Sequence, residues 1–179
     1  MSRIAPVVLS NVDSKVAATL SQVEKGLGMV PNFFATLANA PVVLDGFLGL
    51  SKTLSHGRLT ARQREILALA VGQENECRYC LSAHTTTSKR VGLNDADALR
   101  ARHGDGDDPF ERALASFAQT IVRRRGHLSD AEIESARNAG IDDGLVMEVI
   151  AQVALSTLTN YINEIADTEI DFPAVQVKL

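Results

Sequence analysis

TARQREILALAVGQENECRYCLSAH, residues 60–84, contains two helix patterns separated by a polar break. Thr60 and Gln63 have the spacing of a capping box, which predicts a helix that begins after Thr60 and continues through apolar residues 66–71. The polar residues 73–76 end this pattern, and a second helix is predicted from Cys77 to about Gly92. Helix punctuation of this kind recurs along the chain, and alternating strand patterns are nearly absent. The sequence therefore predicts an all-α fold.

The flanking sequence predicts two helical halves within one domain over residues 1–179. The N-terminal half, about 13–102, contains helices predicted over 14–26, 31–37, 41–57, 60–72, 77–92 and 94–102. A Gly- and Asp-rich loop over residues 103–108 follows. The C-terminal half, about 109–168, contains helices predicted over 109–125, 129–140 and 142–167, and an extended tail covers 171–179. We expect a bundle of about seven or eight helices.

Composition excludes several classes of function. The net charge is -4 with no basic stripe, and aromatic residues make up 4% of the chain, so nucleic-acid binding is not predicted. The first residues lack an apolar signal core, and neither membrane insertion nor secretion is indicated. A cytoplasmic location is therefore expected. No haem, flavin or nucleotide motif is present, and no cofactor is expected.

The two cysteines, Cys77 and Cys80, lie three residues apart, and His84 follows four residues later. On one helix this spacing places all three side chains on one stripe. In a reducing compartment such a pair is more often catalytic or metal-binding than structural. The nucleophile must be a thiolate, and a thiol pKa of about 8.5 must be lowered to supply it. A helix N-terminus would favour the thiolate at Cys77, whereas His84 is nearest in register to Cys80.

Glu65 lies on the mostly apolar helix that precedes the cysteines. If its side chain is buried, it needs a partner, and desolvation would raise its pKa toward the range useful for proton transfer. The alternative pairs Glu65 with Arg62 or Arg64 at the surface. The residues alone leave both interpretations open.

Several motifs follow one another in a specific order: residues 28–32 (GMVPN), residues 62–65 (RQRE) ending in Glu65, the pair Cys77-Arg78-Tyr79-Cys80, and His84. This order resembles the AhpD-like alkylhydroperoxidases of the carboxymuconolactone decarboxylase superfamily. The resemblance covers residues 25–165. It implies an all-helical fold, homo-oligomers, and peroxide reduction by a cysteine pair. It also implies that Cys80 is the peroxidatic cysteine, that Cys77 is the resolving, partner-facing cysteine, and that Glu65 and His84 form a proton relay.

The chain departs from the best-known members at Tyr79, where they place a second histidine. Tyrosine at this position resembles the peroxidase-related branch, but a phenol cannot take up a proton near neutral pH as imidazole can. Tyr79 is included in the predicted catalytic set. Whether tyrosine in place of histidine weakens the peroxidase activity stays open at this point.

The prediction is a cytoplasmic thiol peroxidase for small alkyl hydroperoxides, recycled by an external dithiol or a lipoyl- or thioredoxin-like reductant. Three alternatives are weighed against it. A structural zinc site would use Cys77, Cys80 and His84 but lacks a nearby fourth ligand. A lactone decarboxylase would not need the cysteine pair, and a redox-sensing oligomer would form the disulfide without turnover. A homo-oligomer is also expected because the segments 42–50 and 145–158 are apolar on most sides.

Overall fold

The computed structural model describes residues 2–179, which form helices joined by short loops with no strand among them. This architecture confirms the predicted all-α fold class. The elements, in chain order, are η1 (Leu9–Asn11), α1 (Ser14–Leu27), α2 (Asn32–Leu37), α3 (Pro41–Leu54), α4 (Ala61–Glu74), α5 (Arg78–Thr87), η2 (Ser88–Val91), α6 (Asp95–Arg102), α7 (Pro109–Arg124), α8 (Asp130–Asn138) and α9 (Asp143–Ala166).

Side-chain caps account for most of the helix starts. Asp13 accepts hydrogen bonds from two backbone N–H groups at the start of α1. Complete capping boxes begin α4 at Thr60, α6 at Asn94 and α8 at Ser129. These side chains satisfy N–H groups that have no partner inside the helix, and so the predicted starts are accurate.

The helix ends, and the start at the cysteines, are less accurately predicted. Helix α3 ends at Leu54 rather than near Gly57, and α5 ends at Thr87, after which the 3-10 turn η2 leads to Gly92. Gly92 has φ 83°, the left-handed conformation that suits glycine. Cys77 was predicted inside its helix but is the N-cap of α5. The chain turns just before it, because Glu76 has φ 54°.

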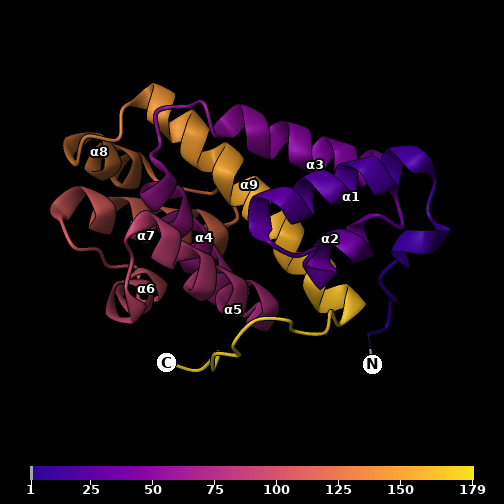
Figure 1. Cartoon of the computed structure of the whole chain (residues 1–179). Helices are drawn as coiled ribbons and strands as arrows, with labels where there is room; N and C mark the ends of the chain where they lie inside the picture. Colours follow the sequence, from indigo (N-terminus) through magenta and orange to yellow (C-terminus); the bar gives the residue numbers. More distant parts are fainter. Residues whose placement is uncertain (1) are drawn as a thin grey trace.

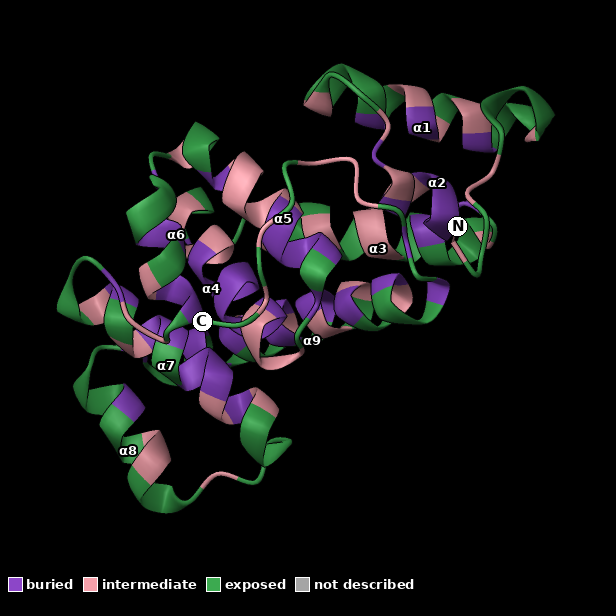
Figure 2. Ribbon diagram, turned by 90° about the horizontal axis from the view of Figure 1, so that it is seen from below, coloured by how far each residue is buried: buried purple, intermediate pink, exposed green. Residues whose placement is uncertain are grey.

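Helices α4 and α9 form the centre of the structure. In Figure 1, α9 crosses the molecule diagonally, with α6, α7 and α8 toward one end and α1, α2 and α3 toward the other. Helix α4 packs against α5, α6, α7 and α9, and Figure 2 shows buried residues concentrated on these elements. The central helices thus supply the frame on which the cysteines are placed.

Buried apolar residues fall into two clusters. The large cluster contains Leu59, Ile66, Leu67, Leu69, Ala70, Val71, Leu81, Leu93, Ala98, Ala101, Leu114, Ala115, Phe117, Ala118, Ile121, Ala136, Ile141, Leu145, Val146, Val149 and Val153. The small cluster contains Val16, Leu20, Phe33, Leu37, Ala38, Leu44, Cys77, Tyr79 and Cys80. Both cysteines therefore belong to the small cluster.

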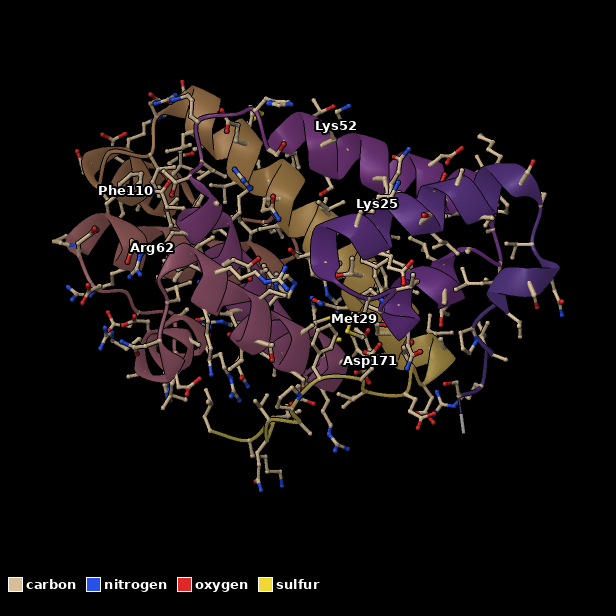
Figure 3. All side chains as sticks on the ribbon, in the orientation of Figure 1. Lys25, Met29, Lys52, Arg62, Phe110 and Asp171 are labelled. Carbon is tan, nitrogen blue, oxygen red and sulfur yellow. The ribbon has the colours of Figure 1, made fainter. Side chains whose placement is uncertain are left out.

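The C-terminal tail, residues 168–179, has no helix or strand but is tied to the helices. Asp171 accepts a hydrogen bond from the backbone N–H of Asn32 at the start of α2, and it is labelled in Figure 3. Further along, Val175 donates its N–H to Ser82, and the Val177 carbonyl accepts from Gln73 and Arg102. The tail thus joins the α2 end of the molecule to α4, α5 and α6.

Helix α9 leaves one apolar face uncovered. By length and composition it could cross a membrane, and half of its apolar window is buried in the protein. Its exposed apolar residues recur at helical spacing: Met147, Ile150, Ala154, Leu158, Tyr161 and Ile165. Helix α3 also exposes Val42, Val43 and Leu50 and buries only Leu44. We call the six α9 residues the α9 stripe.

Candidate active site

The two sulfurs lie side by side where α5 begins. Cys77 Sγ is 2.7 Å from Cys80 Sγ, and it accepts the backbone N–H of Cys80 at 3.3 Å as an N-cap. Both cysteines are free thiols. Although Cys77 lies outside the helix, the N-cap position brings its sulfur as close to Cys80 as disulfide chemistry requires.

The two cysteines differ in their access to solvent. Cys80 lines a cavity of about 320 Å³, whereas Cys77 is fully buried and does not line it. Cys77, which was expected to face an external partner, has no exposed surface in this structure. The sulfur that a molecule in the cavity can reach is that of Cys80.

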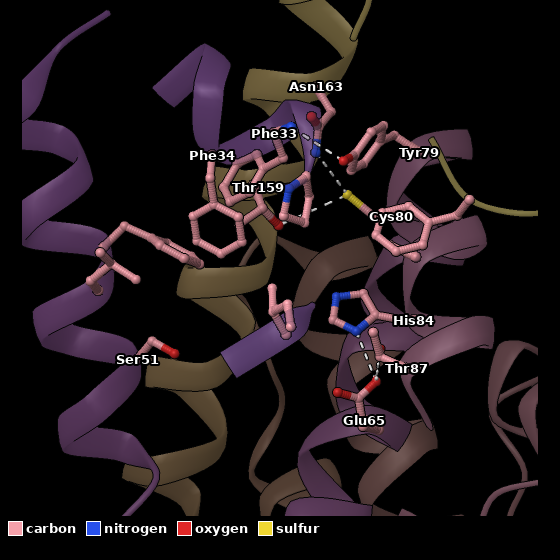
Figure 4. A pocket seen from close by; sticks show the side chains of 16 residues that line it. Phe33, Phe34, Ser51, Glu65, Tyr79, Cys80, His84, Thr87, Thr159 and Asn163 are labelled. Atoms are coloured by element: carbon pink, nitrogen blue, oxygen red, sulfur yellow. Dashed lines mark hydrogen bonds and ion pairs between the residues drawn. The ribbon is translucent and has the colours of Figure 1, made fainter. Parts of the chain in front are cut away.

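His84 and Glu65 form an ion pair on the same wall of the cavity. His84 Nδ1 is 2.9 Å from Glu65 Oε2, and the Thr87 hydroxyl donates to the same oxygen at 3.2 Å. Figure 4 shows His84 between Glu65 and Cys80. Arg62 instead binds Glu111, with Nε 2.7 Å from Oε1, and Arg64 donates to the Leu59 carbonyl. Of the two interpretations of Glu65, the one with a partner inside the protein is correct.

Hydrogen bonds and the nearby imidazole favour a thiolate at Cys80. Burial is the largest single effect and raises the pKa of Cys80, but several smaller effects together outweigh it and lower the pKa to about 6. They are the hydrogen bond from the Cys77 thiol, the charge of His84, and hydrogen bonds from the Asn163 and Asn160 amides. The balance favours the thiolate at Cys80 rather than at Cys77.

Cys77 has the opposite shift. Its hydrogen bond to Cys80 and its burial raise its pKa well above the ordinary value, and the backbone N–H of Cys80 only partly offsets them. The helix N-terminus therefore does not make Cys77 the thiolate. The proton shared by the pair stays on Cys77 and is donated to Cys80.

The ion pair also reverses the pKa expected for Glu65. Burial raises it, as predicted, but the charge and hydrogen bond of His84 and the hydrogen bond of Thr87 outweigh burial, so the pKa of Glu65 lies below its ordinary value. For His84, burial lowers the pKa, whereas the charge and hydrogen bond of Glu65 raise it by more. Glu65 therefore favours the protonated form of His84.

Tyr79 lines the cavity, but its hydroxyl is bonded away from the sulfurs. It donates to Asp171 Oδ1 at 2.8 Å and accepts the backbone N–H of Phe33 at 3.2 Å. The ring packs edge-to-face against Phe172 of the tail. Burial raises the pKa of Tyr79 far above its ordinary value. The hydroxyl thus joins the tail to α2 rather than contacting a reacting sulfur.

Aromatic rings form the opposite wall of the cavity. Phe33 and Phe34 of α2 and Phe47 of α3 pack edge-to-face on one another, with centroids 5.0–5.9 Å apart. Phe172 adds a fourth ring at the cavity. One wall therefore carries the polar groups of α4, α5 and α9, and the other is an apolar surface suited to an organic group.

Three polar residues of α9 near Cys80 were missed by sequence reasoning. Asn163 Nδ2 donates to Cys80 Sγ at 3.3 Å, and the Thr159 hydroxyl lies 3.9 Å from the same sulfur. Asn160, one turn before Asn163, is held by Asn75 at 2.8 Å. A signal existed: polar residues at 156, 160 and 163 share one face of an otherwise apolar helix.

No three His, Cys, Asp or Glu side chains converge as a metal site within residues 2–179. In the zinc alternative His84 would be a ligand, but its Nδ1 is hydrogen-bonded to Glu65. A structural site normally has four such ligands.

Comparison with known proteins identifies a matching family. Residues 41–105 match the model of the Carboxymuconolactone decarboxylase family. This segment extends from the start of α3 to the loop after α6, and it contains Glu65, both cysteines and His84.

Two relatives match by sequence. The alkyl hydroperoxide reductase Rv2159c of Mycobacterium tuberculosis is 27% identical over 99 residues, which cover 55% of this chain and 29% of the relative. Uncharacterized protein 4 in the cox locus of Paracoccus denitrificans is 31% identical over 58 residues, 32% of this chain and 52% of the relative. The matched stretch thus spans less than a third of the first relative and about half of the second.

Solved structures match over nearly the whole chain. The AhpD core of a peroxidase-related protein from Ralstonia eutropha JMP134 has a TM-score of 0.86 and 24% identity, covering 95% of this chain and 92% of that one. A variant of the debrominase Bmp8, bound to 2,3,4-tribromopyrrole, has a TM-score of 0.79 and 20% identity, covering 94% and 91%. At this level of identity the likeness establishes the fold, and the reaction must be argued from the site.

Proposed function

We propose that this chain, whose residues 41–105 match the Carboxymuconolactone decarboxylase family and whose fold is AhpD-like, is a thiol-dependent peroxidase for small organic hydroperoxides. One observation carries the proposal. Cys80 faces the cavity beside the His84–Glu65 pair, and its sulfur is 2.7 Å from that of Cys77.

In the first step the Cys80 thiolate attacks the terminal oxygen of the hydroperoxide. The S–O bond forms, the O–O bond breaks, and Cys80 becomes a sulfenic acid. The departing alkoxide takes a proton from protonated His84, which Glu65 keeps charged. A second cavity of about 230 Å³ also contacts His84 and Glu65 and is lined by Ser51, Ser55 and Ser156, so it offers a polar route for the return of that proton.

In the second step the Cys77 sulfur attacks the Cys80 sulfenic acid. A disulfide forms and water leaves, so two thiols and one hydroperoxide give one disulfide, one alcohol and one water. An external dithiol then reduces the disulfide by two exchanges. Since Cys77 is buried, we propose that this donor first attacks the Cys80 sulfur through the cavity.

The test is peroxide consumption by the whole protein with dihydrolipoamide or reduced thioredoxin as donor. We expect turnover with at least one donor, and mass spectrometry after peroxide treatment should find the loss of two hydrogens with no free thiol. A reversible disulfide without turnover would favour the redox-sensing alternative. Two thiols that survive peroxide with bound zinc would contradict the redox proposal as a whole.

Reductive debromination is a second candidate, favoured by the aromatic lining of the cavity. A flat halogenated ring fits against such a wall, and the same pair of thiols could supply the two electrons, giving the debrominated ring, bromide, a proton and a disulfide. Bromide release from 2,3,4-tribromopyrrole, measured beside hydroperoxide consumption, separates the two reactions. We expect the hydroperoxide to be the faster substrate.

We also propose that the protein is a cytoplasmic homo-oligomer in which the α9 stripe packs against a second copy of the chain. Tyr161 and Ile165 of the stripe are 57% and 65% exposed, more than a core helix normally leaves in water. Light scattering should report a mass well above 19.2 kDa. Ile150→Arg should lower that mass, whereas Ser135→Arg on the exposed side of α8 should not; a wild-type monomer would contradict the idea.

A further inference from the structure

The two ends of the Asn163 carboxamide differ in their hydrogen bonds. Its Nδ2 donates to Cys80 Sγ at 3.3 Å, and its Oδ1 has no hydrogen-bond partner within the described residues. The residue is only 3% exposed, and it lines the cavity. Figure 4 shows the Asn163 amide and the Thr159 hydroxyl near Cys80, with His84 beyond the sulfur.

The orientation of this amide is fixed by chemistry. A thiolate has no proton to donate, so it must face the NH₂ end, and the carbonyl oxygen must then point elsewhere. Buried acceptors without a partner are rare and cost stability. An unpaired acceptor on a cavity wall is available to a donor on a molecule that enters the cavity.

Asn160 provides an internal contrast. It is also buried on α9 and its amide also favours the Cys80 thiolate, but its Oδ1 already accepts from Asn75 Nδ2 at 2.8 Å. Asn160 can therefore support only the sulfur. Of the two asparagines, only Asn163 has a free carboxamide oxygen beside the sulfur.

We propose that Asn163 is a substrate-orienting catalytic residue whose Oδ1 accepts the O–H of a hydroperoxide while its Nδ2 holds the Cys80 thiolate. This assignment rests on the proposed peroxidase function. The O–H marks the terminal oxygen, the one that the thiolate attacks, so a single carboxamide brings both reacting atoms together. The apolar group of the hydroperoxide then lies toward the aromatic wall of Phe33, Phe34 and Phe47.

The experiment compares Asn163→Leu with Asn160→Leu in the full-length protein. Each variant is treated with an organic hydroperoxide in single turnover and, separately, with methyl methanethiosulfonate, a thiol reagent that has no O–H or N–H donor. Both rates are followed to the plateau at high pH, where Cys80 is fully ionised. The plateau removes differences in the thiolate population, and the thiosulfonate rate there reports the remaining change in thiolate nucleophilicity, which rises with the thiol pKa.

We expect both variants to need a higher pH to reach the plateau. At the plateau, the thiosulfonate rates should stay at or slightly above the wild type in both variants, because each loses an amide that supports the thiolate. The hydroperoxide rate relative to the thiosulfonate rate should fall about tenfold in Asn163→Leu alone, the size of one lost hydrogen bond. Equal hydroperoxide plateaus in the two variants would overturn the assignment. A wild type that reacts with the thiosulfonate but with no hydroperoxide would overturn the proposed function and this assignment with it.

Asn163→Ala gives a second variant in case leucine disturbs the packing of α9. Circular dichroism establishes that the helices persist before any rate is compared. The alanine variant should give the same tenfold loss for the hydroperoxide and none for the thiosulfonate. An unchanged hydroperoxide plateau in this folded variant would also overturn the role of Oδ1.

Discussion

The large cluster and the small cluster differ in composition and in how completely they are filled. The large cluster is mainly aliphatic and joins α4, α6, α7, α8 and α9, whereas the small cluster combines aromatic rings with both cysteines and borders the cavity. Partly buried rings, Phe34, Phe47 and Phe172, complete the small cluster. The incompletely filled core is thus the place where a substrate can lie, and the filled core holds the frame.

The cysteine variants should have the largest effect. Cys80→Ser should abolish peroxide consumption, because a serine hydroxyl is not ionised near neutral pH and the cavity holds no other thiol. Cys77→Ser should give one turnover and leave a sulfenic acid on Cys80, trapped by dimedone and located by mass spectrometry. Thermal unfolding of both should stay near the wild type, since the large cluster is untouched. Continued turnover by Cys80→Ser, with trapping on Cys77, would reverse the assignment.

One truncation in each cluster tests the division between frame and cavity. Leu114 is fully buried in the large cluster, and Leu114→Ala should destabilise the protein by roughly 2–5 kcal/mol without changing the reactivity of Cys80. Phe47→Ala, in the partly exposed ring wall, should destabilise it less but raise the KM for an organic hydroperoxide several-fold. Chemical denaturation and steady-state rates measure both. The comparison fails if Leu114→Ala alters thiol reactivity while Phe47→Ala does not alter KM.

The sequence predicted the helices well because their signals are local. The predicted helix starts depend on side chains that contact the backbone three residues further along the chain. Such caps occur at Thr60, Asn94 and Ser129, as predicted. The Cys77–Cys80 contact and the order of Glu65 before the pair were also visible. Local chemistry of this kind needs no knowledge of the tertiary packing.

What the sequence could not predict depends on residues far apart in the chain. The Asn163 contact with Cys80 spans 83 residues, and the Tyr79 contact with Asp171 spans 92. The pKa of Glu65 was expected to rise by desolvation if its side chain is buried, but the contact with His84, 19 residues away, lowers it instead. Cys77 left the helix because Glu76 takes a positive φ, for which the residue type gave no warning.

Glu65→Gln tests how the polar wall of the cavity works. The variant keeps the shape and removes the charge that holds His84 protonated, so we expect peroxide reduction to slow by about 10²-fold near neutral pH, within the range of general acid–base assistance. Arg62→Lys, which alters the separate Arg62–Glu111 pair, is the matched control and should keep the wild-type rate. Wild-type rates for Glu65→Gln at every pH would give Glu65 a structural role only.

The same pair predicts a pH dependence of stability. The pKa of Glu65 is depressed in the folded state, so its contribution is present above its ordinary value of about 4.3 and is lost as pH falls through the folded pKa. The pKa of His84 is raised, so its contribution is present below about 6.5 and is lost as pH rises through the folded pKa. The Tm difference between wild type and Glu65→Gln should therefore be largest between about pH 4.3 and 6.5. A difference that keeps growing above this window would contradict the ion pair.

The smallest effect is expected from Tyr79→Phe, which tests how the small cluster is closed. The change removes the hydroxyl that donates to Asp171 at 2.8 Å and accepts from Phe33 N–H at 3.2 Å, while the ring can still pack against Phe172. Asp171 keeps its bond from Asn32, so the tail should loosen without detaching. We expect a loss of about 1–2 kcal/mol in stability and a fall of less than about tenfold in rate.

The thiol pKa separates a positioning role for Tyr79 from a catalytic one. Because the hydroxyl bonds to the tail and α2, Tyr79→Phe should leave the pH dependence of Cys80 alkylation unchanged while making residues 171–179 easier to cleave by protease. Tyr161→Phe, on the exposed α9 stripe, is the matched control and should change neither property. A shift in the alkylation profile of Tyr79→Phe, with the tail still resistant, would instead place the phenol among the groups that set the reactivity of Cys80.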